Sequence, residues 1–171
     1  MENLKELISR EEIEKRLFEL AEKIDADYKG KEIIALCVMR GSIFFAVELT
    51  LKMKTKMNLE FITLSSYNST ESSGHIKLVQ DLRESIEDKD VLIIEDIVDT
   101  GRSMSYLLEY LKSKKPKSLK LCVLADKPSR REVEVPIDYI GFEVPNKFIV
   151  GYGFDIDNYY RNIPYIGYVE E

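Results

Sequence analysis

The sequence predicts an α/β fold, in which a mostly parallel sheet is flanked by helices and followed by a smaller part rich in β-strands. Short runs of aliphatic residues alternate with helical patterns as far as about residue 125. The runs are apolar at every position, which is typical of parallel strands covered on both faces. After residue 125, short strand-like segments take over.

A first helix is expected over residues 10–27. Ser9 and Glu12 have the spacing of a capping box, in which each side chain bonds the backbone N–H of the other residue. Apolar residues then recur at helical spacing, at Ile13, Leu17, Leu20, Ala21 and Ile24. This pattern indicates an amphipathic helix with one buried face.

The remaining elements follow in the order that the alternation predicts. Helices are expected at residues 43–54 and 102–114. A polar, glycine-containing loop is expected at 68–75. Strands are expected at residues 33–39, 59–67, 76–82, 91–95, 119–125, 139–144, 148–154 and 165–169. No repeat or long linker divides the chain, so residues 1–171 are expected to form a single domain.

Composition limits the partners that the chain is expected to have. The formal net charge is −6, whereas nucleic-acid binders usually carry a basic excess. The lysines around Pro116 are interpreted as a solvated turn that also complements a helix dipole. The N-terminal segment lacks the apolar core of a signal peptide, and no apolar run approaches the ~20 residues that span a bilayer. We therefore expect a cytoplasmic protein that binds neither nucleic acid nor membrane.

The two cysteines are expected to be core residues. Cys37 and Cys122 each lie inside an aliphatic run, which favours buried thiols over a disulfide, a metal pair or a nucleophile. His75 is the only histidine and has no plausible partner for zinc.

The segment VLIIEDIVDTGRSM, residues 91–104, carries the clearest chemical signal. An apolar strand delivers Glu95 and Asp96 to its carboxyl end, where open α/β sheets bind ligands. Asp99 follows, and then a turn that opens a helix, whose N–H groups suit a phosphate. Three acids beside a phosphate indicate a ligand that also carries ribose hydroxyls and Mg²⁺. The alternative is that Asp96 or Asp99 is an N-cap or turn residue.

VLIIEDIVDTG resembles the phosphoribosyl-pyrophosphate-binding motif of type I phosphoribosyltransferases, and most closely that of hypoxanthine phosphoribosyltransferases of bacterial type. The resemblance covers nearly the whole chain. It implies the type I phosphoribosyltransferase fold, with a core at about 30–125 and a β-rich hood at about 126–171 to which the N-terminus contributes. It also implies transfer of a 5-phosphoribosyl group from phosphoribosyl pyrophosphate to N9 of hypoxanthine or guanine. IMP or GMP and pyrophosphate would be the products.

The same resemblance assigns roles within the central motif. Asp99, at the fifth position of EDIVD, is similar to the aspartate of 6-oxopurine enzymes and would act as general base at purine N7. Glu95 and Asp96 would bind the ribose hydroxyls and Mg²⁺. The 5-phosphate would be bound by Thr100, Gly101, Arg102 and Ser103.

Two further segments resemble mobile or pyrophosphate-binding parts of the family. Met39-Arg40-Gly41-Ser42 is similar to the pyrophosphate loop, which often holds a cis peptide bond before its basic residue. Arg40 stands where lysine is common. Ser66 and Tyr67, with the polar loop after them, resemble the lid that closes over the reacting sugar.

The C-terminal part would bind the purine and the leaving group. Lys127 matches the lysine that donates to purine O6, and Phe148 matches the aromatic residue that stacks on the base. The backbone of Ile149 would read the base edge. Asp155 matches an acid that binds a second Mg²⁺, and Arg161 matches the arginine that meets pyrophosphate.

Three alternatives remain open from the sequence. The first is a regulator of the same fold that binds phosphoribosyl pyrophosphate and RNA. The second is a nucleotide-binding module of Rossmann type, although MRGSIF stands where that motif would need GxGxxG. The third is a transferase that prefers xanthine.

The resemblance also implies a homodimer or homotetramer.

Overall fold

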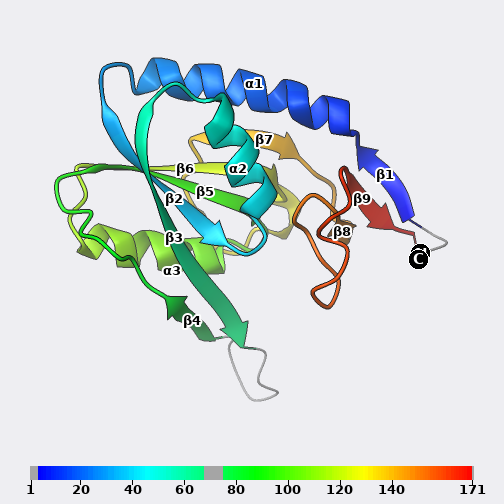
Figure 1. The fold of residues 1–171 in the computed structure, drawn as a ribbon. Coiled ribbons are helices and arrows are strands. Elements are labelled where there is room, and N and C mark those ends of the chain that lie inside the picture. Colours follow the sequence, from blue (N-terminus) through cyan, green and yellow to red (C-terminus); the bar gives the residue numbers. More distant parts are fainter. Residues whose placement is uncertain (1–3, 68–74, 171) are drawn as a thin grey trace.

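The computed structural model describes residues 4–67 and 75–170, and within them it confirms the α/β fold (Figure 1). The main sheet has six strands in the order β4-β3-β2-β5-β6-β7. All its neighbours are parallel except β3 and β4. The strands are β2 (Glu32–Met39), β3 (Lys56–Tyr67), β4 (His75–Gln80), β5 (Asp90–Val98), β6 (Ser118–Asp126) and β7 (Tyr139–Glu143).

Helices cover both faces of this sheet. Helices α1 (Arg10–Asp27) and α2 (Ile43–Lys52) pack on one face, and α3 (Arg102–Ser113) packs on the other (Figure 1). The capping box of α1 is confirmed: Glu12 N donates to Ser9 Oγ at 3.2 Å, and Ser9 N donates to Glu12 Oε2 at 2.8 Å. Helix α2 ends two residues earlier than expected because the chain becomes extended at Met53.

The two faces of the sheet form two hydrophobic clusters, as expected for strands buried on both sides. In β2, Ile33, Ala35 and Cys37 pack toward α1 and α2. The alternating residues Ile34, Leu36 and Val38 pack toward α3. Both cysteines are buried and unpaired, which confirms that they are core thiols.

Three short strands form a second, antiparallel sheet in the order β1-β9-β8. They are β1 (Leu4–Ile8), β8 (Ile149–Val150) and β9 (Ile166–Val169), and β1 lies beside β9, so the two ends of the described chain meet (Figure 1). The expected strand at 148–154 is wrong beyond Val150. Gly151 and Gly153 have positive φ angles of 88° and 104°, and they turn the chain out of the strand.

Strand β5 is longer than the sequence indicated. It continues to Val98 because Ile97 and Val98 pair with Ala125 and Asp126 of β6. Asp96 therefore lies within the strand and not just beyond its end, as the expected strand at 91–95 had implied.

The expected lid falls largely outside the described residues. Ser66 and Tyr67 end β3, where they pair with Ile76 and His75 of β4. Of the expected loop at 68–75, residues 68–74 are not described. In the part of the chain that is described, no helix is both long enough and apolar enough to cross a bilayer.

Candidate active site

A cavity of about 250 Å³ opens at the carboxyl ends of β2 and β5, the edge at which α/β sheets bind ligands. Glu95, Asp96 and Asp99 line it together with the glycine of the expected pyrophosphate loop, Gly41. The turn that leads into α3 completes the wall, through Thr100, Gly101 and Ser103. The structure thus brings the central motif and the start of the pyrophosphate loop to one site.

The turn before α3 has a backbone suited to binding an anion, and hydrogen bonds from residues 132 and 133 fix its position. Gly101 is the N-cap residue, with a φ of 87°, and a Cβ at this position would lie 2.1 Å from the carbonyl oxygen of Val133. The carbonyl oxygen of Thr100 accepts hydrogen bonds from Glu132 N at 2.9 Å and Val133 N at 3.0 Å. A glycine N-cap has no side chain that could bond the first N–H groups of the helix. Such a helix N-terminus is suited to binding a phosphate.

Arg102 does not line the cavity. Its guanidinium forms an exposed ion pair with Glu132, 2.5 Å away. Its backbone N–H lies 3.4 Å from Thr100 Oγ1. Arg102 therefore contributes its backbone to the turn before α3, while its side chain points to the segment behind the turn.

Glu95 and Asp96 form a close, largely buried acidic pair. Glu95 Oε1 accepts a hydrogen bond from Asp96 N at 2.8 Å, and Asp96 Oδ1 accepts one from Ile97 N at 2.8 Å. Burial, and then the neighbouring Asp96 carboxylate, raise the pKa of Glu95 well above its ordinary value. Burial also raises the pKa of Asp96. Cations and hydroxyl donors are the partners that would lower the free-energy cost of ionising these buried carboxyl groups.

The pyrophosphate loop approaches this acidic pair closely. A Cβ at Gly41 would lie 1.8 Å from Asp96 Oδ2, so a side chain at this position would displace the Asp96 carboxylate. The Met39–Arg40 peptide bond is cis, as the resemblance implies. The Arg40 guanidinium donates a hydrogen bond to Asn158 Oδ1 at 3.2 Å, which joins the loop to the segment that carries Arg161.

Gly153 connects the pyrophosphate loop with Arg161, and the sequence reasoning missed it. A Cβ at Gly153 would lie 2.0 Å from the carbonyl oxygen of Gly41. Gly153 N donates to the carbonyl oxygen of Arg161 at 2.9 Å, and Arg161 Nη1 donates back to the carbonyl oxygen of Gly153 at 2.6 Å. The only sequence signal was a second glycine in the run FIVGYGFD.

Asp155 lies outside the cavity and has other partners. Its Oδ1 forms an ion pair with Arg161 Nη2 at 2.8 Å, and its Oδ2 accepts a hydrogen bond from Asn158 N at 2.7 Å. Among the described residues, no three His, Cys, Asp or Glu side chains are grouped for metal binding. Mg²⁺ needs less, because it is usually held by one or two carboxylates with substrate phosphates and water. Glu95 and Asp96 fit that requirement, whereas Asp155 would have to exchange Arg161 for the metal.

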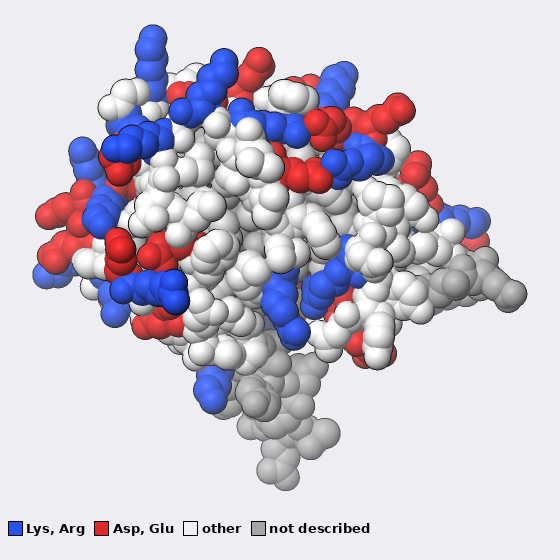
Figure 2. Space-filling view, in the orientation of Figure 1, with Lys and Arg blue, Asp and Glu red and all other residues white. Residues whose placement is uncertain are grey.

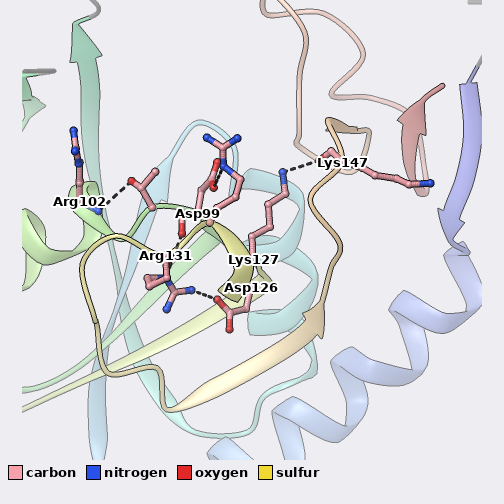
Figure 3. A network of polar contacts seen from close by, with 8 residues as sticks. Asp99, Arg102, Asp126, Lys127, Arg131 and Lys147 are labelled. Carbon is pink, nitrogen blue, oxygen red and sulfur yellow. Dashed lines mark hydrogen bonds and ion pairs between the residues drawn. The ribbon is translucent and has the colours of Figure 1, made fainter. Parts of the chain in front are cut away.

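Asp99 follows β5 and contacts the next segment of the site. Its Oδ1 forms an ion pair with Arg130 Nε at 2.7 Å, without the alignment of a hydrogen bond. Lys127, the first residue after β6, is buried, and its Nζ donates to the carbonyl oxygen of Lys147 at 2.7 Å (Figure 3). Burial lowers the pKa of Lys127, although the Asp99 carboxylate opposes that change.

The aromatic residue expected to stack on a base lies at a second cavity. Phe148 is 62% exposed and lines a space of about 600 Å³ with Ile156 and Tyr168. Ile149 is buried in β8 next to it. Lys147 also lines this cavity, so the hydrogen bond from Lys127 joins the segment that carries Phe148 to the segment that follows β6.

The sheet order, the helices on both faces and the small second sheet together define the type I phosphoribosyltransferase fold. A family model described as "Phosphoribosyl transferase domain" matches residues 3–157. The chain belongs to this family.

Relatives and solved structures agree with the family. The hypoxanthine-guanine phosphoribosyltransferase of Bacillus subtilis (strain 168) is 45% identical over 164 residues, which cover 95% of this chain and 91% of the relative. The hypoxanthine-guanine-xanthine phosphoribosyltransferase of Tritrichomonas foetus is 42% identical over 166 residues, 96% of this chain and 91% of the relative. A crystal structure of a hypoxanthine-guanine phosphoribosyltransferase from Bacillus anthracis has a TM-score of 0.92 at 42% identity, with 97% of this chain and 98% of that chain covered.

Longer proteins match as well. The Bifunctional protein TilS/HprT of Listeria monocytogenes serotype 4b is 45% identical over 164 residues, and the chain spans 25% of its length.

Proposed function

We propose that the protein transfers the 5-phosphoribosyl group of phosphoribosyl pyrophosphate to N9 of hypoxanthine or guanine, as an enzyme of purine salvage. The observation that carries the proposal is the composition of the cavity. It joins an anion-binding helix N-terminus to a buried acidic pair and to Asp99. The names of the Bacillus and Tritrichomonas relatives support the choice of base.

In this proposal each wall of the cavity binds one part of the sugar substrate. The turn at Thr100–Ser103 holds the 5-phosphate, and Glu95 and Asp96 accept hydrogen bonds from the ribose hydroxyls. The backbone at Gly41 and the cations Arg40 and Arg161 receive the pyrophosphate. The bond from the anomeric carbon to pyrophosphate breaks ahead of bond formation, and N9 of the purine attacks that carbon. Asp99 accepts the proton that leaves N7, as a general base.

Magnesium is part of the proposal because the leaving group carries most of the charge. A bound Mg²⁺ would neutralise pyrophosphate as it departs, and Glu95 and Asp96 are the residues that fit it. We expect a chelator to abolish turnover and added Mg²⁺ to restore it. Full turnover in excess EDTA, with metal-free buffers, would remove the metal from the proposal.

The proposed function is tested by ultraviolet detection of nucleotide formation from phosphoribosyl pyrophosphate and Mg²⁺. Hypoxanthine, guanine, xanthine and adenine are offered in parallel. We expect conversion of hypoxanthine or guanine and none of adenine. Conversion of xanthine alone would mean that xanthine, and not hypoxanthine or guanine, is the substrate. Xanthine is one of the bases in the name of the Tritrichomonas relative. A chain that binds the sugar pyrophosphate but converts no base would favour the regulator, which the transferase names of the relatives do not support.

Lys127→Ala should damage the use of the base more than the binding of the sugar. A lysine has three donors, so the hydrogen bond to Lys147 leaves two for purine O6. A buried oxygen that loses its donor costs about 1–3 kcal/mol, so we expect the KM for hypoxanthine to rise about 5- to 150-fold. The KM for phosphoribosyl pyrophosphate should change little. An unchanged KM for hypoxanthine would contradict the role given to Lys127.

We propose a homo-oligomer as well, and one face of the molecule supports it. Phe44, Val47 and Leu51 of α2 are exposed, as are Leu59 and Phe61 of β3. Figure 2 shows a broad uncharged area on the side where α2 lies in Figure 1, with charged side chains around its rim. Exposed apolar areas of this kind commonly mark an interface, here with a second copy.

The cytoplasmic location also remains a proposal. Its support is that Cys37 and Cys122 are free thiols, which is usual where the compartment is reducing.

A further inference from the structure

We infer that Arg131 is a positioning residue, which holds the phosphate turn (residues 100–103) and Asp99 against the strand that leads to Lys127. The inference rests on the proposed function and adds a residue to it. Arg131 does not line either cavity, so it would act through its neighbours and not by touching substrate.

The guanidinium of Arg131 bonds two segments that the reaction would need in fixed relation. Its Nε donates to the carbonyl oxygen of Asp99 at 3.2 Å, just before the phosphate turn. Its Nη2 pairs with the carboxylate of Asp126, the last residue of β6. Figure 3 shows Arg131 between these two partners. Both side chains of the ion pair are only 10% exposed, so solvent screens the pair weakly.

The backbone around Arg131 reinforces the same contact. The two residues after it, Glu132 and Val133, both donate to the carbonyl oxygen of Thr100. The carbonyl oxygen of Val133 and the Cδ of Arg131 are the nearest atoms to the space beside Gly101. Residues 131–133 therefore pack directly against the phosphate turn and fix its position.

Asp126 also places the residue that would read the purine. Lys127 follows it directly, and Lys127 N donates to the carbonyl oxygen of Val98 at 3.0 Å, one residue before Asp99. The Asp99 side and the Lys127 side are thus joined both by backbone pairing and by the side chain of Arg131. Without the guanidinium, the backbone bonds and the Arg130–Asp99 ion pair would remain, but no side chain would join the carbonyl oxygen of Asp99 to Asp126.

An arginine suits this position for a geometric reason. The planar guanidinium presents Nε and Nη2 in fixed directions, so it can bond a carbonyl oxygen and a carboxylate together. A lysine could keep the charge next to Asp126, but its single nitrogen has no second donor held at that spacing. Arg131→Lys is therefore the variant that separates position from charge.

The experiment measures kcat, both KM values and the melting temperature for Arg131→Lys and Arg131→Ala. Arg16→Ala is the matched control, because Arg16 also bonds backbone carbonyls, those of Gly141 and Ile140, but joins α1 to β7 away from the site. We expect Arg131→Lys to stay folded at the assay temperature, with kcat lowered about 10- to 100-fold, the range for a misplaced reacting group. Guanidinium at a non-denaturing concentration should restore part of the activity of Arg131→Ala. Arg16→Ala should lower the melting temperature and leave kcat unchanged.

The outcomes separate this inference from the function on which it rests. A wild-type chain that converts no base overturns both. An active wild type with Arg131→Lys unchanged in kcat and KM overturns the inference alone. The same holds if Arg131→Lys loses activity only in proportion to its unfolded fraction, as Arg16→Ala would on heating.

Discussion

Asp99→Asn should lower kcat by a factor of about 10²–10⁴, the usual contribution of a positioned general base. Asparagine has the size of aspartate and can remain beside Arg130, but its amide cannot accept the N7 proton. Binding of phosphoribosyl pyrophosphate should survive, because the phosphate turn and the Glu95–Asp96 pair are unchanged. Steady-state kinetics and a direct binding measurement give the two results on the same preparation.

Asp88→Asn is a suitable control for that substitution. Asp88 is exposed and lies just before β5, at the opposite end of the strand from the cavity. Its substitution should leave kcat at the wild-type value. Turnover of Asp99→Asn close to that of the control would exclude Asp99 as the base.

Gly101→Ala should nearly abolish binding of phosphoribosyl pyrophosphate. An L-residue in left-handed conformation costs about 1–2 kcal/mol, and the Cβ would also lie 2.1 Å from the carbonyl oxygen of Val133. The turn can relieve that contact only by moving away from the segment behind it, which displaces the N–H groups meant for the phosphate. We expect the KM for the sugar pyrophosphate to rise at least about 100-fold, as a small misplacement can cause.

Gly30→Ala separates strain from displacement. Gly30 has a φ of +75°, similar to that of Gly101, but no atom beyond the adjacent residues lies within 4 Å of its Cβ position. Both variants should lose stability, measured as melting temperature, and only Gly101→Ala should lose substrate binding. Equal KM values for the two variants would show that the turn does not bind the phosphate.

Much of the fold could be predicted because buried strands and helix ends have recognisable local sequence patterns. Strands covered on both faces read as continuous aliphatic runs, and a capping box occupies four consecutive residues. Strand β1 was missed because LKELI carries two charged residues and is ordered by pairing with β9, more than 150 residues later. The end of β5 was misplaced because its last residues are held by β6 and not by their own pattern.

In the candidate site, too, some residues could be predicted from the sequence and others could not. The residues between Glu95 and Ser103 are contiguous, so their shared place in the cavity followed from one motif and one turn. Arg131 and Gly153 contribute contacts to chain segments distant in sequence, and nothing local distinguishes them from an ordinary surface arginine or a loop glycine. Asp155 had an assigned role, but its ion pair with Arg161 could be seen only in three dimensions.

The most direct test of the proposed function is the product formed by the wild-type chain from hypoxanthine, phosphoribosyl pyrophosphate and Mg²⁺. Mass spectrometry would identify the nucleotide, and its ultraviolet spectrum would show which nitrogen carries the ribose. We expect IMP linked through N9, together with one pyrophosphate per nucleotide. Tight binding of the sugar pyrophosphate with no nucleotide formed, under conditions in which the chain is folded, would contradict it.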